Sequence, residues 1–142
     1  MPYLGLDLGS KTLGVSISDK SNIISSPLEV IRYEKEEELF NRLREIIEEK
    51  NITKIILGNP LNMNGTESKR SIISYEFKDK LTSEFNIEVI MQDERLSTVE
   101  AENILISNNT KRKKRRKVID KMASTIILQT YLDRSNNEKK LP

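Results

Sequence analysis

The chain has 142 residues, enough for one domain with a buried core, and it contains neither Cys nor His. These absences exclude disulfides, thiolate nucleophiles, Ser/His/Asp triads and zinc sites built from imidazole or thiolate. An enzyme of this composition has to work with carboxylates, Lys, Tyr or hydroxyls, and carboxylates favour hard cations such as Mg²⁺ or Mn²⁺. The sequence begins without a signal-peptide pattern and has no segment apolar enough to span a membrane, so we expect a cytoplasmic protein.

The net charge of +2 hides an uneven distribution of charge. A short basic run, KRKKRRK at 111–117, lies in a chain whose other residues are more often acidic than basic. Such a segment indicates a polyanionic partner, with nucleic acid the natural one, or else only a solvated loop. We expect a basic loop at 108–117, in which 111–117 forms a mobile binding arm because consecutive like charges repel one another. Its candidate phosphate-binding residues are Lys111, Arg112, Lys113, Lys114, Arg115, Arg116 and Lys117.

The chain opens with three strands. Residues 3–8 form a short apolar segment and predict the first strand. The alternation of apolar with small residues over 13–18 predicts a second strand that forms a hairpin with the first. A turn at 19–22 leads into a third strand from 23 to about 31. Pro27 lies within this strand and favours an edge position or a bulge. Three strands in succession predict that the sheet starts antiparallel.

Helices and strands then alternate. An amphipathic helix is predicted over 34–50, a buried strand over 54–58, a second helix along Ile73, Phe77 and Leu81, and a strand over 87–91. The sequence STVE at 97–100 has capping-box spacing and predicts a helix after the DER at 93–95. A final helix over 118–131 has an apolar face made of Ile119, Met122, Ala123, Ile126 and Ile127.

This order predicts an α/β fold in which one mixed sheet of five strands carries helices on both faces. We expect one domain over 1–134 and a polar C-terminal tail at 135–142.

The sequence GLDLGSKT matches a Walker A loop except at Ser10. It continues as a strand, however, and Asp7 would repel phosphates, so we reject the Walker A interpretation. Instead, Asp7 ends a strand and Gly9 permits a tight turn. The carboxylate of Asp7 then either meets a metal or phosphate, or caps its own loop.

Further candidate groups follow later strands and helices. Asp93 and Glu94 end a strand at the sheet edge where open α/β sheets bind ligands, and alternation points them in opposite directions, so one can be a ligand while the other pairs with a cation such as Arg95. Asp120 lies at the margin of the buried face of the last helix, where it is either a metal ligand or part of a buried ion pair. Asn59 can bond a phosphate or orient water, or simply connect a strand to a helix.

Four segments together, DLGSKTLGVSISD, ILGNPLNMNGTES, QDERLSTVEAE and IDKMAS, closely resemble the YqgF family, also called RuvX or the Holliday junction resolvase family. The resemblance covers about residues 3–133. It implies an RNase H-like fold related to the RuvC resolvase and a metal-dependent nuclease that matures the 5′ end of 16S ribosomal RNA. By position, it implies that the metal-binding catalytic acids are Asp7, Glu94 and Asp120. Ser124 departs from the family pattern, which often has a second Ala there.

The resulting hypothesis is phosphodiester hydrolysis with one or two Mg²⁺ or Mn²⁺ ions. Lys11, Asn59, Arg95 and the basic run would bind the nucleic acid. The alternatives are a resolvase of branched DNA, an actin-like or sugar-kinase ATPase, for which the chain is too short, and a non-catalytic assembly factor that binds ribosomal RNA. The sequence leaves open whether Asp93 takes part and whether the protein is a monomer or a weak homodimer.

Overall fold

The computed structural model describes residues 1–62, 64–93 and 112–139, and only the backbone of 112–121, 138 and 139. In chain order, the elements are β1 (Tyr3–Leu8), β2 (Thr12–Ser18), β3 (Ser25–Arg32), α1 (Glu36–Lys50), β4 (Lys54–Asn59), α2 (Lys69–Phe85), β5 (Glu88–Asp93) and α4 (Arg112–Lys139). The helix predicted after the DER sequence lies outside the described residues.

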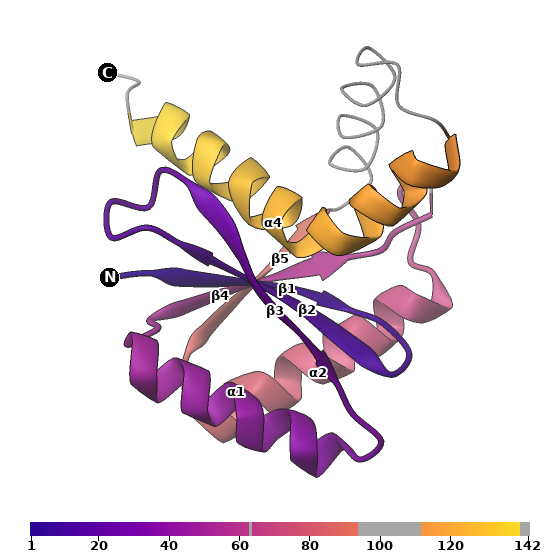
Figure 1. Ribbon diagram of the computed structural model, residues 1–142, viewed down its shortest axis with the longest axis horizontal. Helices are drawn as coiled ribbons and strands as arrows, with labels where there is room; N and C mark the ends of the chain where they lie inside the picture. The colour runs from indigo at the N-terminus through magenta and orange to yellow at the C-terminus, as the bar shows by residue number, and fades with distance from the viewer. Residues whose placement is uncertain (63, 94–111, 140–142) are drawn as a thin grey trace.

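One sheet contains all five strands in the order β3-β2-β1-β4-β5. β2 pairs antiparallel with both β1 and β3, whereas β4 pairs parallel with β1 and β5 pairs parallel with β4. Helices α1 and α2 cover one face of the sheet and α4 crosses the other (Figure 1). The predicted mixed sheet with helices on both faces is therefore confirmed. None of the helices in the described part of the chain combines the length and hydropathy needed to cross a membrane.

The first three strands behave as their sequence predicts. Gly9 N–H donates to the Thr12 carbonyl at 2.8 Å, so β1 turns directly into β2, whereas a P-loop would lead into a helix. β3 is an edge strand, and its register with β2 shifts from Val15↔Glu29 to Ser16↔Pro27. Pro27 thus lies beside a bulge on an edge strand, where the loss of its N–H is tolerated.

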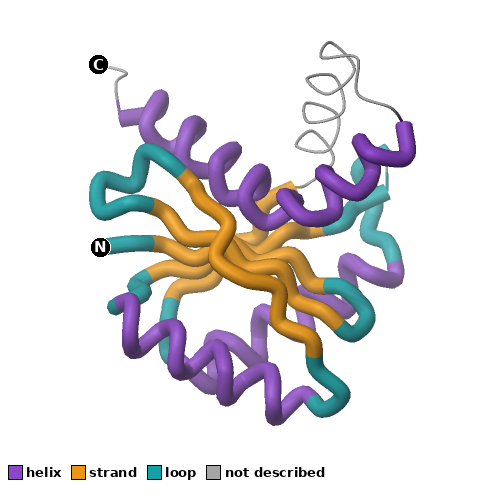
Figure 2. The backbone as a smooth tube through the Cα atoms, viewed as in Figure 1, coloured by secondary structure: helices purple, strands orange, loops and turns teal. Residues whose placement is uncertain are grey.

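The two faces of the sheet pack differently. The main core lies under α1 and α2, where Leu4, Leu6, Leu13, Ile55 and Leu57 are fully buried. A smaller cluster lies under α4 and consists of Ile56, Ile127, Leu128 and Leu132. Figure 2 shows the twisted sheet as the middle of three layers.

The last helix differs from its prediction. It begins at Arg112 and ends at Lys139, whereas the sequence pattern predicted 118–131. Residues 112–117 are therefore helical where a mobile loop was expected, since Lys and Arg are good helix formers despite their like charges. The helix also continues across the boundary predicted at 134. There Asn136 Nδ2 donates to the Asn22 carbonyl at 3.0 Å and holds the end of the helix on the β2–β3 turn.

Two predicted apolar stripes are wrong in part. Ile73 is 54% exposed and Met122 39% exposed, although both were expected in the core. Small polar residues are buried instead, including Ser71 and Ser74 on α2 and Ser124 on α4. Small side chains allow these helices to pack closely, and the Ser71 hydroxyl is satisfied by Asn59 Oδ1. A hydropathy pattern does not anticipate such buried serines.

Candidate functional site

Asp7 lies near the C-terminal end of β1, on the face of the sheet that α4 covers. This face follows from strand alternation, because Gly5 lies against α4, where an added Cβ would come within 2.7 Å of Leu128 Cβ and 2.8 Å of the Ser124 carbonyl oxygen. The side chain of Asp7 is half-buried. The first predicted acid is thus aimed at the sheet–helix interface close to the end of a parallel strand, where α/β folds bind ligands.

Glycines flank Asp7 on both neighbouring strands. It is paired with Gly14 on β2. On the other side, the pairing of Leu6 with Leu57 places Gly58 of β4 next to Asp7. Neither neighbour has a side chain, so space remains around the carboxylate on both sides.

Ser124 of α4 faces this space. A Cβ added to Gly14 would lie 3.7 Å from Asp7 Cβ and 3.5 Å from Ser124 Oγ, so the acid and the hydroxyl lie on either side of one small gap. Ser124 is 3% exposed. The Ser that departs from the family pattern therefore fits here and adds an oxygen next to the acid.

A hydrogen bond holds α4 in place over β1. Ser16 Oγ donates to the Ser124 carbonyl at 2.7 Å, and both residues are buried. Gly5 permits this close approach, because any Cβ there would collide with Ser16 Oγ and with the backbone of α4. Ser16 and Gly5 therefore fix the height of α4 above the sheet.

The direction of α4 places Asp120 toward the same end of the sheet as Asp7. Tyr131 contacts Tyr3 near the start of β1, with ring centroids 6.4 Å apart, whereas Ser124 lies near Asp7. The helix thus runs antiparallel to β1. Asp120 precedes Ser124 by one turn, so its backbone lies about 6 Å further along the helix axis, beyond Asp7. The side chain of Asp120 is not among those that the structure describes.

The end of β5 supplies the next acidic pair. Asp93 is paired with Asn59 and, by alternation, lies on the α2 face of the sheet, opposite to Asp7. Gln92, its neighbour, is buried on the α4 face at the level of Gly58. Glu94 lies outside the described residues, and its predicted role stays a prediction.

Asn59 has a structural environment that its sequence signal did not reveal. It is 6% exposed; its Oδ1 accepts from Ser71 Oγ at 2.6 Å and its Nδ2 donates to Tyr75 Oη at 3.4 Å. Ser68 caps α2 by accepting from Ser71 N–H at 3.0 Å. Asn59 thus ties the first turn of α2 to the end of β4, and contact between Asn59 and a phosphate stays a prediction.

The predicted cationic residues fall into two groups. Lys11 is well exposed in the β1–β2 turn and forms an ion pair of 3.6 Å with Glu34. Residues 112–117 form the beginning of α4 and shortly precede Asp120. Arg95 and Lys111 lie outside the described residues. The backbone therefore brings Lys11 and the basic run to the same end of the sheet as Asp7.

The residues present fit a hard divalent cation. A carboxylate and a hydroxyl face a gap kept open by two glycines, and oxygen donors are what Mg²⁺ and Mn²⁺ prefer. Within the described part of the chain, no group of three or more acidic side chains is close enough to hold a metal. Of the three predicted ligands, only Asp7 has a described side chain, so the complete set stays a prediction.

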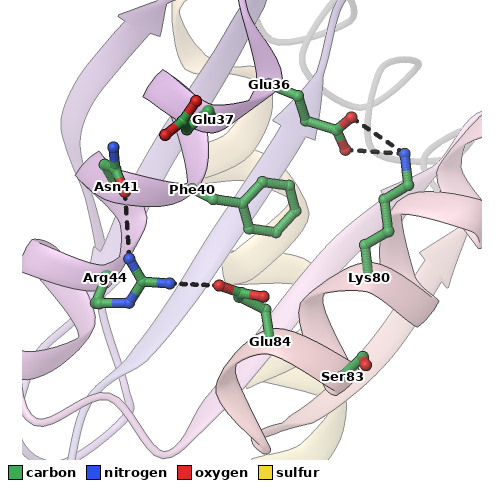
Figure 3. Close-up of a pocket in the computed structure, with 8 residues that line it drawn as sticks. All are labelled: Glu36, Glu37, Phe40, Asn41, Arg44, Lys80, Ser83 and Glu84. Carbon is green, nitrogen blue, oxygen red and sulfur yellow. Dashed lines mark hydrogen bonds and ion pairs between the residues drawn. The ribbon is translucent and has the colours of Figure 1, made fainter.

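A second hollow, of about 590 Å³, lies between α1 and α2 on the other face of the sheet (Figure 3). Two ion pairs bridge it: Lys80 Nζ reaches Glu36 Oε1 at 2.9 Å, and Arg44 pairs with Glu84. Phe40 lies between these pairs and stacks on Phe85, with ring centroids 5.8 Å apart. These contacts join the two helices to each other.

Sequence reasoning missed three residues that shape the site. The hairpin register would have placed Gly14 opposite Asp7 once the turn at 9–12 was known. Gly5 and Ser16 have no local signal, because their roles depend on a helix more than a hundred residues away.

Comparison with known proteins identifies the family of the chain. The family described as "RuvX: Holliday junction resolvase" matches residues 1–134. A relative from Geobacillus thermodenitrificans, named "Putative pre-16S rRNA nuclease", is 51% identical over 135 residues, covering 94% of this chain and 98% of that protein. A relative of the same name from Lactococcus lactis subsp. cremoris is 47% identical over 132 residues, covering 92% of each.

Solved structures share the fold. RuvC from T. thermophilus, in complex with a Holliday junction substrate, has a TM-score of 0.58 at 12% identity and covers 95% of this chain and 96% of its own. The fowlpox virus Holliday junction resolvase has a TM-score of 0.52 at 15% identity, with 94% and 99% covered. These structures bear out the predicted RNase H-like fold. Because the family match spans nearly the whole chain and the relatives are similar along almost their full length, the chain belongs to the RuvX family.

Proposed function

We propose that the chain is a metal-dependent nuclease that hydrolyses phosphodiester bonds in the precursor of 16S ribosomal RNA. The observation that carries this proposal is Asp7, held between two glycines under the helix that carries Asp120. The names of the relatives support the substrate, and the absence of Cys and His from the chain leaves carboxylates as the available metal ligands.

Asp7, Glu94 and Asp120 would hold one or two Mg²⁺ or Mn²⁺ ions. Bound there, the metal supplies an activated water and stabilises the departing 3′ oxygen. The chain's own residues position the acids. Ser16 and Gly5 seat α4 on the sheet, and Asn59 holds the start of α2 against β4.

The cationic residues would hold the substrate backbone. Lys11 projects from the turn two residues beyond Gly9, and residues 112–117 lead directly into the turn of α4 that carries Asp120. Contacts of this kind bind phosphates without reading the base sequence, so they position the nucleic acid over the acids. We expect Arg95 to contribute in the same way.

The test is to measure the cleavage of a labelled 16S precursor with Mg²⁺ or Mn²⁺ for Asp7→Asn, Glu94→Gln and Asp120→Asn. We expect each variant to stay folded by circular dichroism and to lose detectable cleavage. Asp93→Asn is the matched control, and it should keep cutting because Asp93 lies on the opposite face of the sheet. A folded Asp7→Asn protein that cuts at the wild-type rate would refute the mechanism. If a labelled four-way DNA junction is cut faster than the RNA, branched DNA replaces the 16S precursor as the proposed substrate.

A further inference from the structure

A groove of about 620 Å³ begins where β1 ends. Its walls include Leu8 at the end of β1, Ser10 in the β1–β2 turn, Tyr33 after β3, and Arg70 and Ile73 from α2. Leu8 directly follows Asp7, and consecutive Cα atoms are about 3.8 Å apart. The groove therefore adjoins the proposed catalytic site, but opens on the α1/α2 side of the sheet.

Apolar and aromatic surface lines one side of the groove. Ile73 is 54% exposed and lines the groove, so its side chain is available to contact a ligand there. Tyr33 is half-buried, and its N–H donates to the Lys11 carbonyl at 3.1 Å, which fixes the residue at the rim. Burial raises the pKa of Tyr33 above its ordinary value. An aromatic ring next to an aliphatic wall suits a nucleobase.

Arg70 supplies positive charge at the mouth. Its Nη2 donates to the Leu8 carbonyl at 3.1 Å, which holds the guanidinium against the residue that follows Asp7. Among the described residues, Arg70 has no carboxylate within ion-pair distance. A guanidinium has five N–H donors in a planar fork, which matches a phosphate well.

A smaller hollow of about 180 Å³ shares Leu8, Tyr33 and Ile73 with the groove. Its other lining residues are Leu39, Phe77, Glu36, Glu76 and Lys80. Lys80 pairs with Glu36, so this hollow offers apolar surface for a base beside a cation that already has a partner. We therefore expect the base on the apolar side chains and the phosphate at Arg70.

We propose that this groove binds one unpaired nucleotide next to the scissile phosphate and thereby makes the nuclease prefer single-stranded segments to continuous duplex. A volume in the usual range of ligand pockets accommodates a single nucleotide. A base that is stacked and paired within a duplex cannot enter it without being extruded. The preference concerns the substrate of the proposed nuclease and so rests on that function.

Two neighbouring residues of α2 provide a matched test. Ile72 is 51% exposed and Ile73 54% exposed, but only Ile73 lines the groove. We would compare Ile73→Glu with Ile72→Glu, which change the net charge equally, and add Tyr33→Ala and Tyr33→Phe. Fluorescence anisotropy in EDTA measures the affinity of each protein for a labelled single-stranded RNA and for the corresponding duplex.

We expect Ile73→Glu and Tyr33→Ala to weaken binding of the single strand about tenfold, the scale of one lost base–aromatic contact. Ile72→Glu and Tyr33→Phe should change it less than about twofold, and duplex binding should be unaffected throughout. Equal losses for Ile72→Glu and Ile73→Glu, or unchanged binding by Tyr33→Ala, would overturn the proposal. Because no metal is present, the result is independent of cleavage. Lost single-strand binding together with an active Asp7→Asn protein would refute only the proposed mechanism.

Discussion

The two faces of the sheet are built from different kinds of residue. Under α1 and α2, the strands contribute large aliphatic side chains such as Leu4, Leu6 and Leu57, all fully buried. Under α4, the same strands contribute Gly5, Asp7, Gly14 and Ser16, so the helix lies close to the strand backbone. One face therefore supplies most of the apolar burial, and the other supplies room for a charged site.

The α4 face adds buried hydrogen bonds between helix and sheet to its smaller apolar cluster. Apolar packing tolerates some rearrangement, whereas hydrogen bonds fix a helix in both direction and height. On the α4 face, Ser16 bonds to the Ser124 carbonyl, and Gln129 donates to the Ile23 carbonyl and accepts from Ser25 N–H, both at 2.8 Å. A site that needs acids from a strand and a helix to meet is better served by the second kind of contact.

The largest expected change in stability is on the α1/α2 face. Leu57→Ala removes a fully buried side chain from the main core and should lower the free energy of unfolding by about 2–5 kcal/mol. Urea denaturation measures this loss. Cleavage per folded molecule should stay near the wild-type value, because Leu57 points away from Asp7. A stability loss under about 1 kcal/mol, or a lower specific activity of the folded fraction, would contradict the division between the faces.

Gly5→Ala should impair cleavage more than stability, the reverse of Leu57→Ala. The added methyl group would collide with Ser16 Oγ and with the backbone and Leu128 of α4, so the helix must shift. Overpacking of this kind costs about 1–3 kcal/mol in stability. Cleavage per folded molecule should fall by a larger factor than the loss of stability alone would cause, because Asp120 moves with α4. Gly14→Ala is the control for stability, since its methyl group would make only ordinary contacts of 3.5–3.7 Å. Equal stability losses in the two variants would contradict the close fit at Gly5.

Ser16→Ala isolates the hydrogen bond that seats α4. It leaves the Ser124 carbonyl without this donor and should lower the free energy of unfolding by about 1 kcal/mol. Amide hydrogen exchange should rise mainly in α4. Ser26→Ala, on the exposed side of β3, should change stability by less than about 0.5 kcal/mol. Indistinguishable exchange in α4 for the two variants would show that the bond does not hold the helix.

The sequence predicted well what depends on local patterns. The hairpin at Gly9, the bulge near Pro27 and the strand-end position of Asp7 follow from residues within a few positions of one another. Resemblance to a family added the order of the three acids. The opposite facing of Asp93 and Asp7 required the register of three strands, which no single segment contains.

What the sequence could not predict depends on contacts between distant segments. The helix α4 continues beyond residue 131 to Lys139. There Asn136 bonds to the β2–β3 turn, which lies more than a hundred residues earlier in the sequence. Ile73 fitted a stripe of apolar residues four apart, yet α2 buries Ser74 and leaves Ile73 at a groove. A hydropathy pattern counts apolar residues and does not distinguish a core from a binding surface.

The smallest expected effect concerns the β2–β3 turn, at the far end of α4 from the proposed site. Asp19 Oδ1 accepts from Ile23 N–H at 2.8 Å and Ile24 N–H at 3.1 Å, and these bonds lower the pKa of Asp19 below its ordinary value. A lowered pKa in the folded state means that ionised Asp19 stabilises the fold above the pKa of the unfolded chain. This contribution is lost as the pH falls through the folded pKa. We therefore expect Asp19→Ala to melt at a lower temperature than wild type near neutral pH, and the two melting temperatures to converge in acid. Cleavage at neutral pH should be unchanged, because the turn lies far from Asp7. A difference in melting temperature that persists unchanged in acid would assign the effect to packing of the turn, since a charge-dependent bond must disappear when Asp19 is protonated.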